Sequence, residues 1–196
     1  MLQSLRNAWR TPELRKKILF TLLIILLYRF GASVPVPYIS SGVMQTFANS
    51  ADGSLFQYMN LLSGDAFSKA TLFALSVSPY ITASIVIQLL TIAIPALERL
   101  SKEGEEGTKK ITAITRYVTV VLALITSFGY YMLMRNSGML TNTGWFPAVV
   151  IIASYCAGAA LVMWLAEKIN ESGIGNGISI ILFANIVSSA PSILSS

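Results

Sequence analysis

Long apolar runs separated by short polar, charge-bearing segments make up this chain. Several runs are close to the roughly 20 residues that an α-helix needs to cross the hydrocarbon core of a bilayer. We therefore expect an all-α polytopic membrane protein in which residues 1–196 form a single transmembrane domain, since no linker separates two halves. The predicted membrane spans cover approximately residues 18–36, 76–95, 111–134, 146–165 and 174–190.

One moderately apolar stretch, residues 55–72, is too polar to cross lipid alone. The residues that interrupt it are Gln57, Asn60, Ser63, Gly64, Asp65, Ser68 and Lys69, and exposing them to lipid is costly. A segment that enters the membrane and returns is tolerated only where protein or a water-filled cavity surrounds it. We therefore expect a short re-entrant helix at about residues 63–72, capped by Ser63 or Asp65, and with it a cavity.

The Lys and Arg residues predict the orientation. Five of them precede the first span, five lie between or just inside the second and third spans, and Lys168 lies between the fourth and fifth. With a cytosolic N-terminus, only Lys69 and Arg135 lie outside, which is the asymmetry of the positive-inside rule. Five spans then place the C-terminal end outside. A charge facing lipid is costly, so Arg29, within the first span, should either snorkel outward or face a polar protein interior, and we favour the interior.

Composition supports a membrane protein and argues against an enzyme. Hydrophobic residues make up 54% of the chain and charged residues 12%, far more apolar side chain than a soluble domain of this size could cover. The chain has no histidine, and Cys156 is its only cysteine. These facts exclude the usual zinc and haem sites and any histidine-based acid–base mechanism, so we expect no metal and no cofactor. We interpret Glu167 and Glu171 as cytosolic loop charges beside Lys168 rather than as a catalytic pair.

Two charged or glycine-rich segments suggest ligands only weakly. The net charge of +5 comes mostly from basic residues beside span ends, so we expect no nucleic-acid binding. The glycine-rich residues 173–177 follow no predicted strand and lack the Gly-Lys-Ser/Thr ending of a nucleotide-binding loop. We expect them to form a tight turn that begins a helix. Residues 98–110 are predicted to be a flexible solvated loop, with a docking site for a cytosolic partner as the alternative.

Two pairs of aliphatic residues have either a structural or a functional interpretation. Ile81 and Ile85 are four residues apart in the second span, as are Ile178 and Leu182 in the fifth, so each pair lies on one helix face. Such pairs are common in membrane helices, and spacing alone favours ordinary packing over a pore. The fifth span is also unusually polar, which suggests that it faces a cavity or a partner helix rather than lipid.

Several motifs together resemble the SecY family, the channel subunit that moves unfolded polypeptides across or into a membrane. Residues 74–90 (ALSVSPYITASIVIQLL) resemble the second-span signature of that family, and residues 164–179 (WLAEKINESGIGNGIS) resemble the signature leading into its fifth span. Supporting matches are RFG at residues 29–31, VPVP at 34–37 and KEGEEG at 102–107. The resemblance covers essentially the whole chain and the first five of the family's ten spans.

The resemblance implies a clamshell of two inverted halves around an hourglass pore that is closed by a ring of aliphatic side chains and an external plug helix. This half's share of the pore ring would be Ile81, Ile85, Ile178 and Leu182. The plug would include Ser63, Gly64, Asp65, Ala66, Phe67, Ser68, Lys69 and Ala70. One wall of a lateral gate toward lipid would include Ser84, Ile85, Gln88 and Leu89. A cytosolic partner loop would consist of Lys102, Glu103, Gly104, Glu105, Glu106 and Gly107.

The resemblance also implies partners and a location. The partners would be membrane lipids, SecE-like and SecG-like small subunits, a SecA-type motor or the ribosome, signal peptides and translocating polypeptides, and a complementary C-terminal half of the channel. The expected location is the inner (plasma) membrane of a bacterium. Two alternatives remain at this point: an orphan half-channel that only binds a SecE-like subunit as an assembly module, and one repeat of a small-solute transporter.

Overall fold

A computed structural model describes residues 11–39, 63, 66, 68–75, 77–136, 138, 140–142 and 144–194, with side chains up to residue 188. Within these ranges the regular elements are α-helices, which confirms the predicted all-α class. The helices are α2 (Pro12–Gly31), α5 (Ser78–Ala93), α6 (Pro95–Lys102), α7 (Glu105–Asn136), α8 (Trp145–Ser172) and α9 (Gly177–Leu194).

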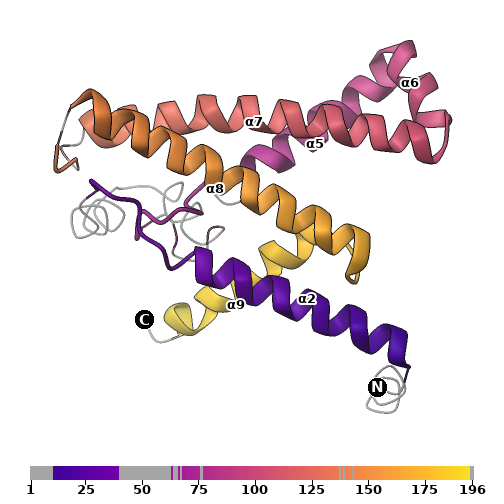
Figure 1. Ribbon diagram of the computed structural model, residues 1–196, viewed down its shortest axis with the longest axis horizontal. Helices are drawn as coiled ribbons and strands as arrows, with labels where there is room; N and C mark the ends of the chain where they lie inside the picture. The colour runs from indigo at the N-terminus through magenta and orange to yellow at the C-terminus, as the bar shows by residue number, and fades with distance from the viewer. Residues whose placement is uncertain are drawn as a thin grey trace.

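The helices form a layered bundle in which sequence neighbours pack side by side (Figure 1). The long helix α7 packs against both α5 and α8, and α6 folds back onto the start of α7. On the other side of α8 lie α2 and α9, which also contact each other. The axes of α7 and α8 are close where a short loop joins them and diverge toward the end of α8 (Figure 1).

Proline favours the starts of three helices. The N–H groups in the first turn of a helix have no acceptor within the helix, so proline, which lacks this N–H and has a fixed φ, fits there. Proline lies in the first turn of α2, of α5 and of α6. Ile94, which precedes Pro95, is extended at φ −108° and ψ 113°, as the steric demand of the following ring favours. The axes of α5 and α6 therefore meet at 101°, so the second apolar run ends in a sharp bend.

Two of the described helices, α7 and α8, are long and apolar enough to cross a membrane, and the bent pair α5 and α6 would make a third if it is one span. Helix α9 is apolar but shorter over its described part, Gly177–Ser188. Helix α2 is 20 residues long, but it carries Glu13, Arg15, Lys16, Lys17 and Arg29. The predicted number of five spans thus stays a prediction.

The prediction of a flexible loop at residues 98–110 was wrong. Helix α6 continues to Lys102, and only two residues separate it from α7, so the charged stretch is two helix ends joined by a tight turn. Charges four residues apart support both helices: the Lys102 Nζ lies 2.6 Å from the Glu98 Oε1, and the Lys109 Nζ lies 3.3 Å from the Glu105 Oε1. Gly104 provides the turn with a φ of +79°, which a residue with a Cβ rarely adopts.

Buried side chains form two clusters along α8. The central cluster contains Ile24, Tyr28, Ala32, Ala66, Phe73, Val77, Tyr80, Val162, Met163, Leu165, Ala166, Ile169 and Ile181. The end cluster lies near the loop between α7 and α8 and contains Val36, Ala70, Ala74, Leu75, Tyr130, Tyr131, Met134, Ile151 and Tyr155. The central cluster draws on α2, α5, α8 and α9, so it is the place where the expected pore elements meet.

The segment before α5 is held by backbone pairing with the chain that follows α2. The Val36 N–H donates to the Ala70 carbonyl at 3.0 Å, and the Leu72 N–H donates to the Val34 carbonyl at 2.9 Å. Helix α8 approaches the same segment closely: a Cβ built on Gly158 would lie 2.0 Å from the Leu72 carbonyl oxygen. These contacts fix residues 68–75 between α2 and α8, directly ahead of α5.

Candidate functional site

The central cluster places most of the expected ring residues around one buried junction. Ile81 of α5 and Ile178 and Leu182 of α9 are half-buried and pack against this cluster. Ile85, one turn after Ile81, is 52% exposed and lies outside the cluster. The structure therefore brings three of the four expected ring residues to one junction and leaves the fourth on an open helix face.

The described part of the expected plug segment approaches the same junction. Ala66 is buried in the central cluster, whereas Ala70 is buried in the end cluster. Ser63 is also buried, Ser68 is half-buried and Lys69 is exposed. Ala66 and residues 68–70 form turns. Gly64, Asp65 and Phe67 lie outside the described residues, so the predicted plug helix and its cap at Asp65 stay predictions.

An apolar strip runs along the exposed side of α5, where we expect the lateral gate. Ile85, Leu89 and Ile92 are 52%, 61% and 80% exposed and follow one another at helical spacing. Gln88 lies exposed beside this strip, while Ser84 is half-buried. Three of the four expected gate residues, Ile85, Gln88 and Leu89, are therefore exposed on α5.

The glycine-rich turn between α8 and α9 is a structural element, as predicted. The Gly177 N–H donates to the Asn170 Oδ1 at 2.7 Å, and the Ile174 N–H donates to the Thr21 Oγ1 of α2 at 3.2 Å. A Cβ built on Gly177 would lie 2.0 Å from the Ala166 carbonyl oxygen. Only glycine permits this approach, which seats the start of α9 directly on the last turns of α8.

Polar groups join α2 to α9 inside the bundle. The guanidinium of Arg29 donates to the Ala184 carbonyl oxygen, in agreement with the prediction that this residue faces the protein interior. The Asn185 amide, which is fully buried, donates to the Tyr28 hydroxyl at 3.0 Å. The polar residues of this helix, Asn185 among them, led us to expect either a cavity or a partner helix. The structure provides that partner in α2.

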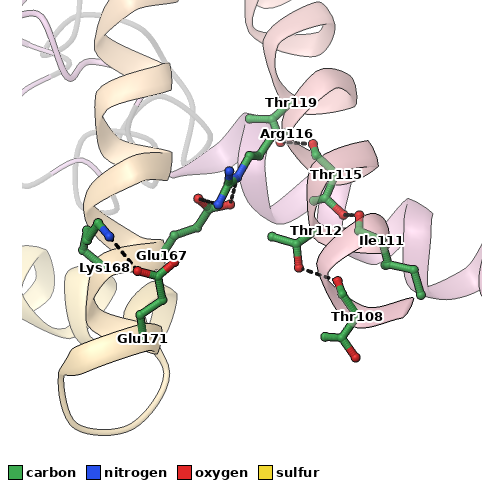
Figure 2. Close-up of polar contacts among 9 residues, drawn as sticks. All are labelled: Thr108, Ile111, Thr112, Thr115, Arg116, Thr119, Glu167, Lys168 and Glu171. Atoms are coloured by element: carbon green, nitrogen blue, oxygen red, sulfur yellow. Dashed lines mark hydrogen bonds and ion pairs between the residues drawn. The ribbon is translucent and has the colours of Figure 1, made fainter. Parts of the chain in front are cut away.

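An ion pair between α7 and α8 was not foreseen. Glu167 lies within α8 and is only 5% exposed, so its assignment to a solvated loop was wrong. Its carboxylate accepts two bonds from Arg116, from Nε to Oε1 and from Nη2 to Oε2, each at 2.9 Å (Figure 2). The signal for a longer α8 was its apolar stripe, because buried Val162 and Ala166 are followed on the same face by buried Ile169.

The expected cytosolic partner loop is the turn between α6 and α7. Its residues from Lys102 to Glu106 are exposed, and Gly107 is buried against α6. The Lys110 Nζ lies 3.9 Å from the Glu103 Oε2, and both side chains are largely exposed. Exposed ion pairs of this kind contribute little stability. The turn thus presents a compact, charged surface at one end of the bundle.

Comparison with known proteins decides the family. The SecY family model matches residues 71–196. The chain belongs to the SecY family. Over 99% of its length it is 43% identical to the protein translocase subunit SecY of Streptomyces coelicolor, of which it covers 47%. It is 42% identical to SecY of Thermus thermophilus, with 95% of this chain and 44% of that relative covered. The chain therefore spans about half the length of the curated SecY relatives it matches.

Two solved structures share the fold of this SecY-family chain. They are Sec61 in the canine ribosome–channel complex from the endoplasmic reticulum, and a structure described as that of a protein-conducting channel. Each has a TM-score of 0.62 at 18% identity and covers 89% of this chain and 37% of the matched chain. The likeness at this identity shows a shared fold, in agreement with the fold that the sequence motifs implied.

Proposed function

We propose that this chain is the N-terminal half of a protein-conducting channel that moves unfolded secretory polypeptides across a membrane and releases apolar segments sideways into lipid. Membership of the SecY family supports this proposal. The observation that carries it is the convergence of Ile81, Ile178 and Leu182 on the buried junction that also contains Ala66 of the expected plug. A small-solute transporter repeat has no comparable support.

Branched aliphatic side chains suit the proposed constriction. A narrow apolar ring excludes water and ions by dewetting, and it makes few polar contacts that would hold a passing chain. In this half the ring would consist of Ile81, Ile85, Ile178 and Leu182, with the segment around Ala66 as the plug. The exposed strip on α5, which includes Ile85 and Leu89, would receive the apolar helix of a signal peptide on its way into lipid.

Several partners belong to this proposal. A complementary C-terminal half would face α5 and complete the ring, and SecE-like and SecG-like subunits would pack around the assembled channel. The charged turn between α6 and α7 would meet a SecA-type motor or the ribosome, and one solved structure of the same fold comes from a ribosome–channel complex. The proposed location is the inner membrane, with the N-terminus and this turn in the cytosol, as the distribution of Lys and Arg predicts.

Crosslinking from the ring position tests the proposal. In a Cys156→Ala background, an Ile85→Cys variant would be probed for crosslinking to a stalled secretory chain, with and without a co-expressed complementary half of SecY from Streptomyces coelicolor. A matched control is Val121→Cys, because Val121 is 59% exposed on α7 and equally apolar but lies on a different helix.

The expected result is a crosslink from residue 85 only when the complementary half is present, with little from residue 121. Crosslinks of equal strength from both positions would mean nonspecific contact with the translocating chain. A complete lack of crosslinks from residue 85 in both conditions would refute the pore assignment. Retrieval of a SecE-like subunit in that case would favour the assembly-module alternative.

A further inference from the structure

We propose that the Arg116–Glu167 ion pair is a brace that sets the separation of Ile81 from Ile178 and so keeps this half of the constriction closed. This inference rests on the proposed channel function. Arg116 and Glu167 would be positioning residues, because they act on the ring through neighbouring backbone rather than by touching a translocating chain.

The geometry of the pair is that of a strong, directed contact. Arg116 reaches from α7 and bonds both carboxylate oxygens of Glu167 on α8 (Figure 2), with two distances of 2.9 Å. A planar guanidinium that meets both oxygens of a carboxylate fixes orientation as well as distance. The Glu167 side chain is 7% exposed and the Arg116 side chain 49% exposed, so the pair lies at the edge of the bundle with its acidic member inside.

The pair lies far from the loop that connects α7 and α8, where a contact has most influence on the distance between the two helices. Helices α7 and α8 diverge from the loop that joins them (Figure 1), and Glu167 lies near the far end of α8. Among the ion pairs that the described side chains form, this one alone links those two helices. It therefore holds α7 to α8 where the connecting loop constrains them least.

Two short paths connect the pair to the ring. On one side, Glu167 follows Ala166, whose carbonyl oxygen is the close neighbour of Gly177, and Gly177 directly precedes Ile178. On the other side, Tyr80 is buried in the central cluster within electrostatic range of both Arg116 and Glu167, and it directly precedes Ile81.

These paths predict how the ring responds when the pair is lost. Helix α5 packs mainly along α7 and has a smaller contact with α8 around Tyr80, whereas α9 packs on α8, so a shift of α7 away from α8 would draw α5, with Ile81, away from Ile178. A larger distance between α7 and α8 therefore becomes a larger distance between the two ring residues. Removal of Arg116 also leaves the buried carboxylate of Glu167 without its counter-charge. An unpaired buried charge is costly, so α7 and α8 should rearrange rather than keep their original packing.

Neighbouring polar groups do not replace this link. The hydroxyls of Thr115 and Thr119, on either side of Arg116, donate to carbonyls one turn earlier in α7 at 2.9 Å and 2.7 Å (Figure 2). Lys168 donates to the Glu171 Oε2 at 2.6 Å, but both belong to α8. The Lys168–Glu171 pair is thus a natural control, since it is an ion pair on the same helix that joins no second helix.

The test uses the channel assembled from this chain and a complementary C-terminal SecY half, reconstituted in liposomes. The variants are Glu167→Gln, which keeps the shape but removes the charge, Arg116→Lys, which keeps the charge but not the two-bond geometry, and the control Lys168→Gln. The measurement is ion leak per assembled channel without a translocating chain. A second measurement uses Ile81→Cys with Ile178→Cys in a Cys156→Ala background and bifunctional maleimides of graded length.

We expect Glu167→Gln to raise the leak about tenfold, which corresponds to about 1.4 kcal/mol in the ratio of open to closed channels. Arg116→Lys should raise it less, and Lys168→Gln should leave it unchanged. The double change Arg116→Gln with Glu167→Gln should be no worse than the stronger single change, because the two residues act as one unit. In Glu167→Gln, residues 81 and 178 should crosslink best through a longer reagent than before.

Several outcomes would refute the proposed role of the Arg116–Glu167 pair. Unchanged leak and unchanged crosslink length in Glu167→Gln would refute it, and so would an equal effect of Lys168→Gln. A purely structural role would lower the amount of assembled channel without raising the leak of each one. Failure of the unmodified assembly to translocate any chain would instead refute the proposed function, while the maleimide lengths would still report the separation of residues 81 and 178.

Discussion

Replacing Gly158 with alanine should destabilise the chain, because α8 has no room for a side chain at this point. A Cβ there would lie 2.0 Å from the Leu72 carbonyl oxygen and 3.0 Å from the Leu72 carbonyl carbon. Ordinary van der Waals contact begins near 3.4 Å, so the two backbones must separate by about 1 Å or more in a closely packed region. The obstacle is backbone, which cannot rotate away as a side chain would.

The displacement would be costly because Leu72 is already bonded. Its N–H donates to the Val34 carbonyl at 2.9 Å, and a shift of Leu72 strains that bond. Overpacking of this kind costs about 1–3 kcal/mol. Alanine recovers up to about 1 kcal/mol in a helix interior relative to glycine, so the net expectation for Gly158→Ala is a loss of about 1–2 kcal/mol.

Gly129→Ala is the matched control. Gly129 lies inside the apolar helix α7, and a Cβ there meets nothing within 4 Å, so this change should be neutral or stabilising by up to about 1 kcal/mol. The two variants should therefore differ by about 1–3 kcal/mol, or about 2–12 °C in the apparent midpoint of thermal unfolding for a chain of this size. The measurement is the fraction that remains monodisperse in detergent after heating. Equal midpoints for the two variants would refute the close approach of α8 to Leu72.

Three other changes test contacts that position the site. Gly107→Ala places a Cβ 1.7 Å from an α6 carbonyl oxygen, so trypsin should cleave the turn between α6 and α7 faster, and an unchanged cleavage rate would contradict this packing. Asn185→Ala removes the 3.0 Å bond to the Tyr28 hydroxyl inside the bundle and should cost about 1–3 kcal/mol in the same thermal assay. Thr21→Val leaves the Ile174 N–H without its acceptor, so hydrogen exchange at this amide should accelerate, whereas exchange in the middle of α7 should not.

Features with local causes could be predicted from the sequence. Apolar runs of bilayer length indicated the helices, and the expected end of the second run at residue 95 coincides with the bend between α5 and α6. The glycine-rich residues 173–177 form the expected turn, because only glycine, which has no Cβ, allows two backbone segments to approach this closely. Arg29 bonds to a carbonyl of α9, as the cost of a lipid-facing charge predicted.

Two local features were misinterpreted, and one feature that depends on tertiary packing could not be predicted. Charge was read as a sign of loop at residues 98–110, yet pairs such as Glu98–Lys102 have the spacing that stabilises a helix. The same rule placed Glu167 in a loop, although the apolar stripe of α8 continues to Ile169. Nothing in the spacing of Arg116 and Glu167 along the sequence indicates that they meet, because the angle between α7 and α8 decides it.

The exposed faces of α5 and α7 differ in a way that bears on which of them meets another protein. On α7, exposed Val121, Ile125 and Phe128 form an apolar surface that lipid can cover at no polar cost. On α5, exposed Ile85 is accompanied by exposed Gln88, and an amide facing hydrocarbon would lose its hydrogen bonds to water. A protein or water-lined neighbour satisfies both residues, since it offers apolar contact to one and hydrogen bonds to the other. The face of α5 therefore fits a protein or water-lined neighbour better than it fits lipid, which is why residue 85 is the informative position for testing the proposed channel by crosslinking and residue 121 its control.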